Sequence, residues 1–173
     1  MRTIGDEGKK VTRILFVCWG NICRSPMAEF VMKDLAGKAG LEDRFVIASA
    51  ATSGDEVWGG HGSPVYPPAM EQLLAHGIGT PGNELGVAAK EAVRLVRDDY
   101  KRYDMLIGME QMNLRYMKKI CGGDPEAKMS RLLDHTESPA DIEDPWFTHN
   151  FRRVYEQIET GCRGLLEELT GRI

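Results

Sequence analysis

The sequence predicts a single α/β domain in three layers, with a four-stranded parallel sheet between helices and an anion-binding loop after the first strand. Short, largely apolar runs alternate with segments of helical spacing, and 173 residues suit one compact domain. A polar loop at residues 18–25 separates the first apolar run from the first helical segment. Doubly wound, flavodoxin-like sheets bind ligands at such strand ends.

The predicted strands are short and apolar, as expected for strands buried on both faces of a parallel sheet. They cover residues 13–17, 45–48, 103–107 and 131–133. The predicted helices lie between and after these runs, at residues 25–39, 67–76, 88–100, 111–120 and 147–169. The last has apolar side chains at helical spacing: Phe151, Val154, Tyr155, Ile158, Cys162, Leu165, Leu166 and Leu169. Right-handed crossovers would join the strands.

Composition limits the kinds of partner. The formal net charge of −4 gives no general attraction to nucleic acid or to an anionic membrane, so any affinity for anions must be local. Residues 1–11 are polar and predict a flexible lead-in to a domain at 12–173. They lack the apolar core of a secretory signal, and no later stretch is long enough to span a bilayer. We therefore expect a cytoplasmic protein that binds neither nucleic acid nor membrane.

The cysteines are expected to be reduced, because no secretory signal accompanies them. There are four, Cys18, Cys23, Cys121 and Cys162. Cys18 and Cys23 have no second pair at short spacing, and the histidines are scattered along the chain. No metal site is expected.

The loop after the first predicted strand places a thiol and a guanidinium around one small volume. It begins with Cys18, reaches Arg24 after five residues, and leads into a helix. Backbone N–H groups between a strand end and a helix N-terminus point inward, and the helix dipole adds positive potential. An oxyanion fits this volume, and the same field stabilises a thiolate, so we expect Cys18 to be a nucleophile.

The other loop residues suit the same task. Arg24 can hold two oxygens of a tetrahedral anion with its planar fork. Gly20 permits close approach, Asn21 tolerates the left-handed conformation, and Ser25 can donate its hydroxyl to the thiolate. An isolated cysteine or arginine is usually a packing residue or a surface charge. The combination in a strand, loop and helix context favours an anion-binding site.

These residues resemble the low-molecular-weight protein tyrosine phosphatases. The family signature, Val-Cys-x-Gly-Asn-x-Cys-Arg-Ser-Pro, is matched from Val17 to Pro26, and the resemblance covers about residues 12–169. It implies a nucleophilic Cys18 and phosphate bound by the loop, without a cofactor. The expected phosphate-binding residues are Trp19, Gly20, Asn21, Ile22, Cys23, Arg24 and Ser25.

The resemblance also implies the acid that protonates the leaving group. The family uses an Asp before Pro and an aromatic residue, which here is Asp144. Asp144 would protonate the leaving oxygen while Cys18 attacks phosphorus, and would then take a proton from the water that cleaves the phosphocysteine. Local sequence alone favours a helix N-cap or turn residue for Asp144, and the resemblance reverses this order.

Supporting residues follow from the same resemblance. His76 would hydrogen-bond Asn21 and brace the loop together with Ser49, although a polar residue at a helix C-terminus is an alternative for His76. Cys23 would be the redox partner that forms a reversible disulfide with Cys18, and its alternative is a small packing residue.

Substrate preference depends on the walls of the pocket. Phosphotyrosine-specific members commonly have Ile or Leu where this chain has Ile22, whereas members acting on phosphoarginine have Thr. Asp55 stands where the family has an aromatic wall, in a loop about four residues longer than usual. We expect Trp58 to supply the wall, with Trp146, Phe147 and Trp19 adding apolar surface; packing against the core is the alternative for Trp58.

The expected substrate is therefore a phosphotyrosine protein, and phosphate, sulfate or vanadate should bind the loop. An arsenate reductase or a phosphoarginine phosphatase on the same scaffold is an alternative, as is a non-catalytic phosphate-binding module. The reductase would need closely spaced further cysteines, whereas Cys121 and Cys162 are far apart. Glu110 occupies a position where Asp is frequent in the family.

Overall fold

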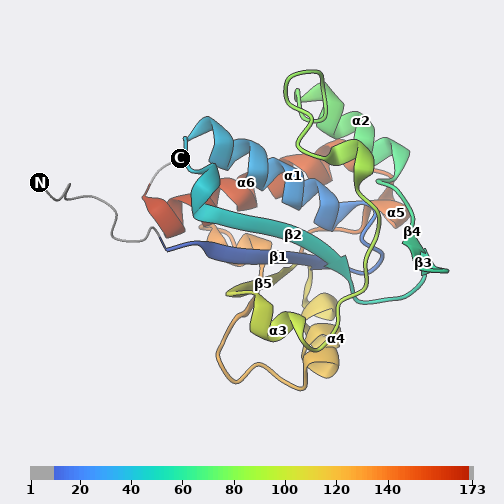
Figure 1. Cartoon of the computed structure of the whole chain (residues 1–173), viewed down its shortest axis with the longest axis vertical. Coiled ribbons are helices and arrows are strands. Elements are labelled where there is room, and N and C mark those ends of the chain that lie inside the picture. The colour runs from blue at the N-terminus through green and yellow to red at the C-terminus, as the bar shows by residue number, and fades with distance from the viewer. Residues whose placement is uncertain (1–9, 172–173) are drawn as a thin grey trace, which may run out of the picture.

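A four-stranded parallel sheet forms the centre of the structure, a computed structural model that describes residues 10–171 (Figure 1). Its strands lie in the order β2 (Phe45–Ala51), β1 (Thr12–Cys18), β5 (Met105–Gly108) and β6 (Met129–Arg131). The predicted sheet is confirmed. The predicted lead-in 1–11 lies, except for residues 10 and 11, outside the described range.

Helices cover both faces of the sheet. The longer ones are α1 (Arg24–Lys38), α2 (Pro67–Ala75), α4 (Gln111–Cys121) and α6 (Phe151–Thr170), and the short ones are α3 (Asp99–Arg102) and α5 (Pro145–Thr148). Turns of 3₁₀ helix lie at Glu42–Arg44, Val87–Ala89 and Leu132–His135. Helices α1 and α6 lie on one face of the sheet, and α3 and α4 on the other (Figure 1). Within residues 10–171, no helix is long and apolar enough to cross a membrane.

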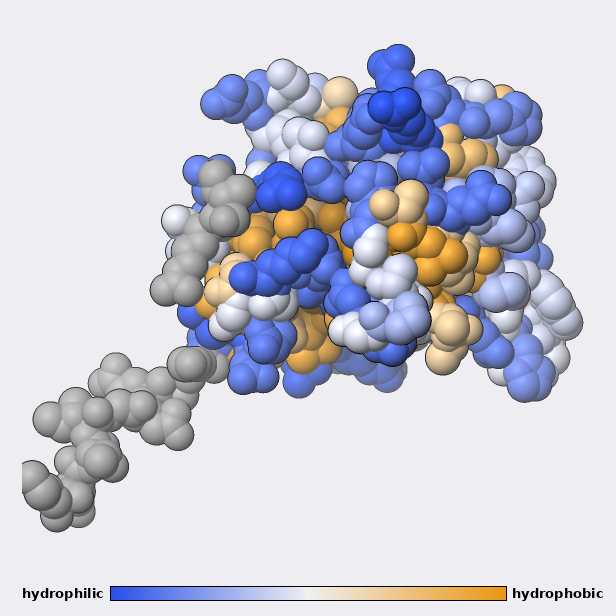
Figure 2. Space-filling view, turned by 90° about the horizontal axis from the view of Figure 1, so that it is seen from above, coloured by the Kyte–Doolittle hydropathy of each residue, from blue (hydrophilic) through white to orange (hydrophobic). Residues whose placement is uncertain are grey.

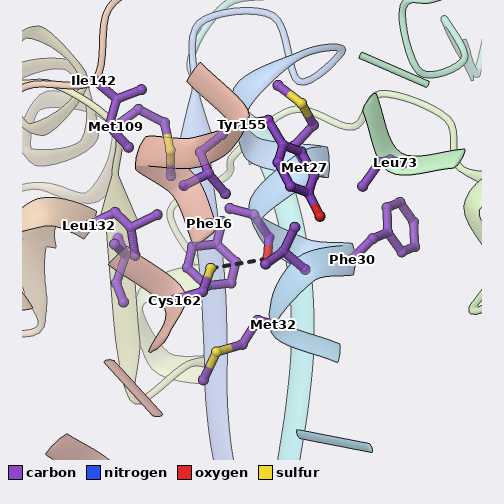
Figure 3. Packing of buried hydrophobic residues seen from close by; sticks show 14 of the residues in the cluster. Phe16, Met27, Phe30, Met32, Leu73, Met109, Leu132, Ile142, Tyr155 and Cys162 are labelled. Atoms are coloured by element: carbon purple, nitrogen blue, oxygen red, sulfur yellow. Dashed lines mark hydrogen bonds between the residues drawn. The ribbon is translucent and has the colours of Figure 1, made fainter. Parts of the chain in front are cut away.

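Side chains of β1 alternate between two hydrophobic clusters, as the two-residue period of a strand requires. Ile14 and Phe16 join the larger cluster with α1, α2 and α6, whereas Leu15 and Val17 join the cluster beside α4. Figure 3 shows Phe16 in the larger cluster, and the Cys162 thiol of α6 donates to Ala28 O of α1 at 3.7 Å. Viewed from above, polar side chains cover most of the surface, with apolar ones between them near its centre (Figure 2).

The predicted helix at 88–100 is wrong. After a 3₁₀ turn the chain forms single β-bridges at Glu91 and Arg94 and then a turn before α3, because residues 91–95 pair with distant segments instead of with each other. Ala51 N donates to Val93 O at 2.7 Å, Leu95 N to Ala51 O at 2.8 Å, and Ala92 N to Ser63 O at 2.8 Å. Apolar spacing alone does not distinguish these tertiary hydrogen bonds from helical ones.

Two other predicted elements need adjustment. The last strand ends at Arg131, and residues 132–135 form a 3₁₀ turn. The last helix is interrupted: His149 adopts a left-handed φ of 58°, which ends α5, and Asn150 caps α6 by accepting from Arg153 N. The other predicted strands and helices agree with the structure within a few residues.

A small hairpin was not predicted. Strands β3 (Val57–Trp58) and β4 (His61–Gly62) pair antiparallel around Gly59 and Gly60, whose φ values are 56° and 78°. Two consecutive glycines suit a two-residue hairpin turn with positive φ at both positions. The hairpin and α5 lie beyond the carboxyl ends of the central strands (Figure 1).

Candidate active site

A cavity of about 260 Å³ lies at the carboxyl end of β1. Its lining combines the predicted loop with segments that lie far away in sequence: Cys18, Trp19, Gly20, Ile22, Cys23, Arg24, Asp55, Glu56, Asp144, Trp146 and Phe147. Helix α1 begins at Arg24, directly after the loop, so its N-terminal dipole acts on the cavity.

The Cys18 sulfur receives two polar contacts inside the loop. Ser25 Oγ lies 3.0 Å from Cys18 Sγ, and Asn21 N donates to the same sulfur at 3.3 Å. Both residues that contact the sulfur are buried. The polar contacts and the helix N-terminus together suit a sulfur that carries negative charge.

Asn21 is the centre of the support for the loop. Its backbone has a left-handed φ of 59°. Its side chain donates to Ser25 Oγ at 2.8 Å and to Ser49 Oγ at 2.9 Å, and it accepts from Val93 N at 3.0 Å. These bonds hold Asn21 in the left-handed conformation in which its own backbone N–H donates to the Cys18 sulfur.

The prediction that His76 braces Asn21 is wrong. His76 follows the last residue of α2, where its Nδ1 pairs with Gln72 O at 2.7 Å. Its ring stacks on Tyr155 at a centroid distance of 3.9 Å. The alternative of a polar residue at a helix C-terminus therefore describes His76. The hydrogen bond to Asn21 expected from the His76 side chain comes from the backbone N–H of Val93 instead.

Arg24 is fixed by three acceptors. Only 2% of it is exposed. Nη1 donates to Ile142 O at 2.9 Å, and Nη2 lies 3.3 Å from Glu110 Oε1 and 3.5 Å from Asp144 Oδ2. Glu110 thus pairs with the arginine of the loop, a role that its sequence position did not reveal.

Asp144 both caps a helix and faces the cavity. Its Oδ1 accepts from Trp146 N at 3.0 Å at the start of α5, and its Oδ2 lies near Arg24. The two interpretations that the sequence left open are therefore compatible. The cap fixes one oxygen and leaves the other directed at the loop.

Aromatic side chains form part of the mouth. Trp146 packs on Tyr66 with a centroid distance of 5.2 Å, and Phe147 is 77% exposed. On another side, Trp19 contacts Tyr116 edge-on at 5.4 Å. Trp146, Phe147 and Trp19 line the cavity as expected.

Comparison with known proteins places this site in a family. The sequence model described as low molecular weight phosphotyrosine protein phosphatase matches residues 13–172. The chain belongs to this family. Low molecular weight protein-tyrosine-phosphatase YfkJ of Bacillus subtilis (strain 168) is 37% identical over 158 residues, covering 90% of this chain and 94% of its own. The low molecular weight phosphotyrosine protein phosphatase of Sus scrofa is 34% identical over 171 residues, covering 93% and 98%.

The fold comparison agrees. The crystal structure of YfkJ from Bacillus subtilis is similar to the phosphatase with a TM-score of 0.81 at 35% identity, covering 94% of this chain and 96% of that chain. The predicted family, the fold class and the enzyme class, a phosphoric monoester hydrolase, are confirmed.

The predicted position of Trp58 is wrong. Trp58 does not line the cavity and is 60% exposed, so it forms neither the pocket wall nor part of the core. Its hairpin extends the chain past the mouth, and Asp55 and Glu56 line the cavity instead. Asp55 accepts from Trp19 Nε1 at 2.9 Å, which fixes both side chains.

Sequence reasoning missed a buried ionic group behind the loop. Ser49 Oγ donates to Glu29 Oε1 at 2.6 Å, and Glu29 accepts from Lys33 Nζ at 2.7 Å. Lys90 Nζ donates to Ser49 O at 3.1 Å and lies 3.7 Å from Glu29. Burial lowers the pKa of Lys90, and the nearby Glu29 carboxylate opposes this shift. The segment predicted as a helix supplies this lysine.

Cys23 differs chemically from Cys18. Burial, with smaller contributions from negative charge on Cys18 and Asp144, raises the pKa of Cys23 to about 12. All four cysteines are unpaired. Among residues 10–171, no group of three or more His, Cys, Asp or Glu side chains is arranged to hold a metal ion.

Proposed function

We propose that this phosphatase hydrolyses phosphotyrosine in proteins and that the reaction passes through a phosphocysteine intermediate. The observation that carries the proposal is that one cavity contains Cys18, Arg24 and the carboxyl group of Asp144. The aromatic mouth suits the ring of phosphotyrosine. The names of the two relatives support this substrate class.

In the first step the Cys18 thiolate attacks phosphorus in line with the leaving oxygen. A sulfur–phosphorus bond forms while the bond from phosphorus to the tyrosine oxygen breaks. The leaving oxygen takes the electron pair of that bond and a proton from Asp144, so neutral tyrosine departs. Arg24 and the inward loop amides bind the equatorial oxygens.

In the second step water attacks the phosphocysteine. Asp144, now a carboxylate, takes a proton from the water as the new oxygen–phosphorus bond forms. The sulfur–phosphorus bond breaks and its electron pair returns to Cys18 as thiolate, and inorganic phosphate leaves. This chemistry requires only groups of the chain and water, and phosphate, sulfate or vanadate should compete for the loop.

The structure supplies arguments against the alternative activities. An arsenate reductase would pass the reaction to further thiols, yet Cys162 lies in the core between α1 and α6, and Cys121 ends α4. Neither lines the cavity. A phosphoarginine phosphatase is disfavoured by Ile22, which lines the cavity with an apolar side chain. We infer a cytoplasmic location, where thiols stay reduced.

The experiment compares phosphate release from phosphotyrosine, phosphoserine and phosphoarginine peptides. The wild type should act chiefly on phosphotyrosine, and Cys18→Ser should bind the peptide without turnover. Asp144→Asn keeps the helix cap but cannot supply a proton. Its kcat should fall about 10²–10⁴-fold on the peptide, and far less on 4-nitrophenyl phosphate, whose leaving group needs no proton.

The matched control is Asp98→Asn, an exposed aspartate at the N-cap of α3 that does not line the cavity. It should behave as wild type. Release of phosphate chiefly from phosphoarginine would overturn the substrate assignment. Retained turnover in Cys18→Ser would overturn the phosphocysteine mechanism.

Cys23 is proposed as the redox partner of Cys18. Peroxide would oxidise Cys18 to a sulfenic acid, and the Cys23 thiol would displace water from it to form a disulfide. Mass spectrometry after peroxide treatment should find this disulfide in the wild type, with activity restored by dithiothreitol. Peroxide should inactivate Cys23→Ser irreversibly; equal recovery of both proteins would contradict the role.

A further inference from the structure

The hairpin beside the cavity presents an acidic and aromatic face. Its ladder extends beyond β3 and β4, because Ser63 N donates to Glu56 O at 2.9 Å and Ser63 Oγ donates to Glu56 Oε2 at 2.6 Å. Glu56 and Trp58 are two residues apart on this ladder, so their side chains are on the same face. Since Glu56 lines the cavity, Trp58 continues that face outward from the mouth.

The opposite face fixes the hairpin to the body of the protein. Gly62 packs so closely on the backbone of Ala92 that an added Cβ would lie 1.8 Å from Ala92 O. Ala92 N also donates to Ser63 O at 2.8 Å. The exposed indole of Trp58 is therefore held on a fixed support outside the cavity, without packing in either hydrophobic cluster.

Two carboxylates line the mouth of the cavity, those of Asp55 and Glu56. Asp55 and Glu56 form no ion pair with any residue in the part of the chain that the structure describes, although Arg94 lies against Gly54 at the foot of the hairpin. They are fixed by Trp19 Nε1 and by Ser63 Oγ. Negative charge at the mouth opposes entry of a phosphate dianion. The two carboxylates are therefore suited to contact a different part of the substrate, one that carries positive charge.

We propose that residues 54–63 dock a lysine or arginine side chain that flanks the phosphotyrosine of the protein substrate. This inference rests on the proposed function. Asp55 and Glu56 would pair with the cation, and the exposed face of Trp58 would stack on it. An arginine should bind better than a lysine, because its planar guanidinium both stacks and forms paired hydrogen bonds.

The geometry also limits where the basic residue stands. Same-face neighbours on a strand are about 6–7 Å apart, which is also the length of two residues in an extended peptide. A basic side chain within about three residues of the phosphotyrosine therefore reaches both the carboxylates and the indole.

The test measures kcat/KM for phosphotyrosine peptides that carry Arg, Ala or Glu at each of the three positions on either side. Every value is divided by the value of the same protein variant for free phosphotyrosine. At pH 7.5 and low salt, the wild type should prefer the best arginine peptide over its glutamate counterpart by about tenfold, as expected for two ion pairs and a cation–π contact. This preference should shrink at 0.5 M NaCl.

Two variants separate the contributions. The double variant Asp55→Asn and Glu56→Gln should lower the arginine-to-glutamate ratio to about two, and Trp58→Ala should lower the arginine-to-alanine ratio about threefold. The control is Glu42→Gln with Asp43→Asn, which removes the same charges in the exposed turn preceding β2, at the opposite end of that strand. This control should keep the wild-type ratios.

The outcomes separate the two proposals. Hydrolysis of free phosphotyrosine without any preference among the flanking residues would overturn the docking proposal alone. A preference that persists in both hairpin variants would also overturn it, because the cation would then bind elsewhere. Failure of the wild type to hydrolyse free phosphotyrosine or any peptide would instead overturn the proposed function.

Discussion

Asn21 shows how a single residue links the loop to the rest of the molecule. Its left-handed backbone directs its own N–H at the Cys18 sulfur, and its side chain bonds to Ser25, Ser49 and Val93. The loop composition predicts the conformation, because Asn tolerates a left-handed φ. Two of the three partners come from distant segments that no local spacing identifies.

Replacement of Asn21 should separate backbone from side-chain effects. Asn21→Ala should lower the free energy of unfolding by about 3 kcal/mol, since buried partners lose their bonds and alanine is strained at positive φ. Asn21→Gly should cost about 1 kcal/mol less, because glycine adopts this φ freely. Urea denaturation measures both, and kcat should fall at least tenfold in each variant. Equal losses of stability would contradict the backbone contribution.

The raised pKa of Cys23 predicts selective alkylation. Below pH 9 the Cys23 thiol stays protonated, because burial raises its pKa to about 12. Iodoacetamide at pH 7.5 should therefore label Cys18 first, as peptide mass spectrometry would show. In the Cys18→Ser variant, iodoacetamide should label Cys23 at least a hundredfold more slowly than it labels Cys18 in the wild type. Rapid labelling of Cys23 in that variant would contradict the raised pKa of its thiol.

At the scale of elements, helix α6 packs closely because two of its residues have no side chain. A Cβ on Gly161 would lie 2.5 Å from Leu132 Cγ, and one on Gly164 would lie 2.2 Å from His135 O. The sequence predicted the helix from its apolar spacing. The need for glycine at these positions follows only from the 3₁₀ turn that packs against them.

Alanine substitutions test this packing. Gly164→Ala should lower the free energy of unfolding by about 2 kcal/mol or more, because the clash with a backbone oxygen exceeds the gain in helix propensity. The control Gly37→Ala, on α1 where nothing lies within 4 Å of the added Cβ, should raise it by up to about 1 kcal/mol. Equal effects in thermal denaturation would contradict the packing argument.

At the scale of the whole molecule, buried protonated groups should limit stability in base. Burial raises the pKa of Cys162, Cys121 and Tyr155 in the folded state. Above the pKa of a thiol in the unfolded chain, about 8.5, the unfolded state loses protons that the folded state keeps. The contribution of these three groups to the free energy of unfolding should therefore be constant below about pH 8 and fall as pH rises further.

Cys162→Ala isolates one contribution. The variant should be about 1–2 kcal/mol less stable than the wild type at pH 7, because of the small cavity, and the difference should shrink above pH 9. Each buried thiol contributes a slope of at most about 1.4 kcal/mol per pH unit. Urea denaturation from pH 7 to 10.5 measures this. Parallel curves for the two proteins would contradict the role of the thiol.

The sequence by itself determined the fold class and the loop at residues 18–25, with Cys18 and Arg24 around one cavity, because these depend on local spacing between a strand and a helix. Only the tertiary structure decided which distant groups meet that loop. The backbone of Val93, and not the side chain of His76, donates a hydrogen bond to Asn21. Glu110 forms an ion pair with Arg24, and Trp58 lies outside the cavity. These positions depend on hydrogen bonds and ion pairs between segments that are far apart in the sequence. Such contacts leave no periodic pattern in the chain from which they could be predicted.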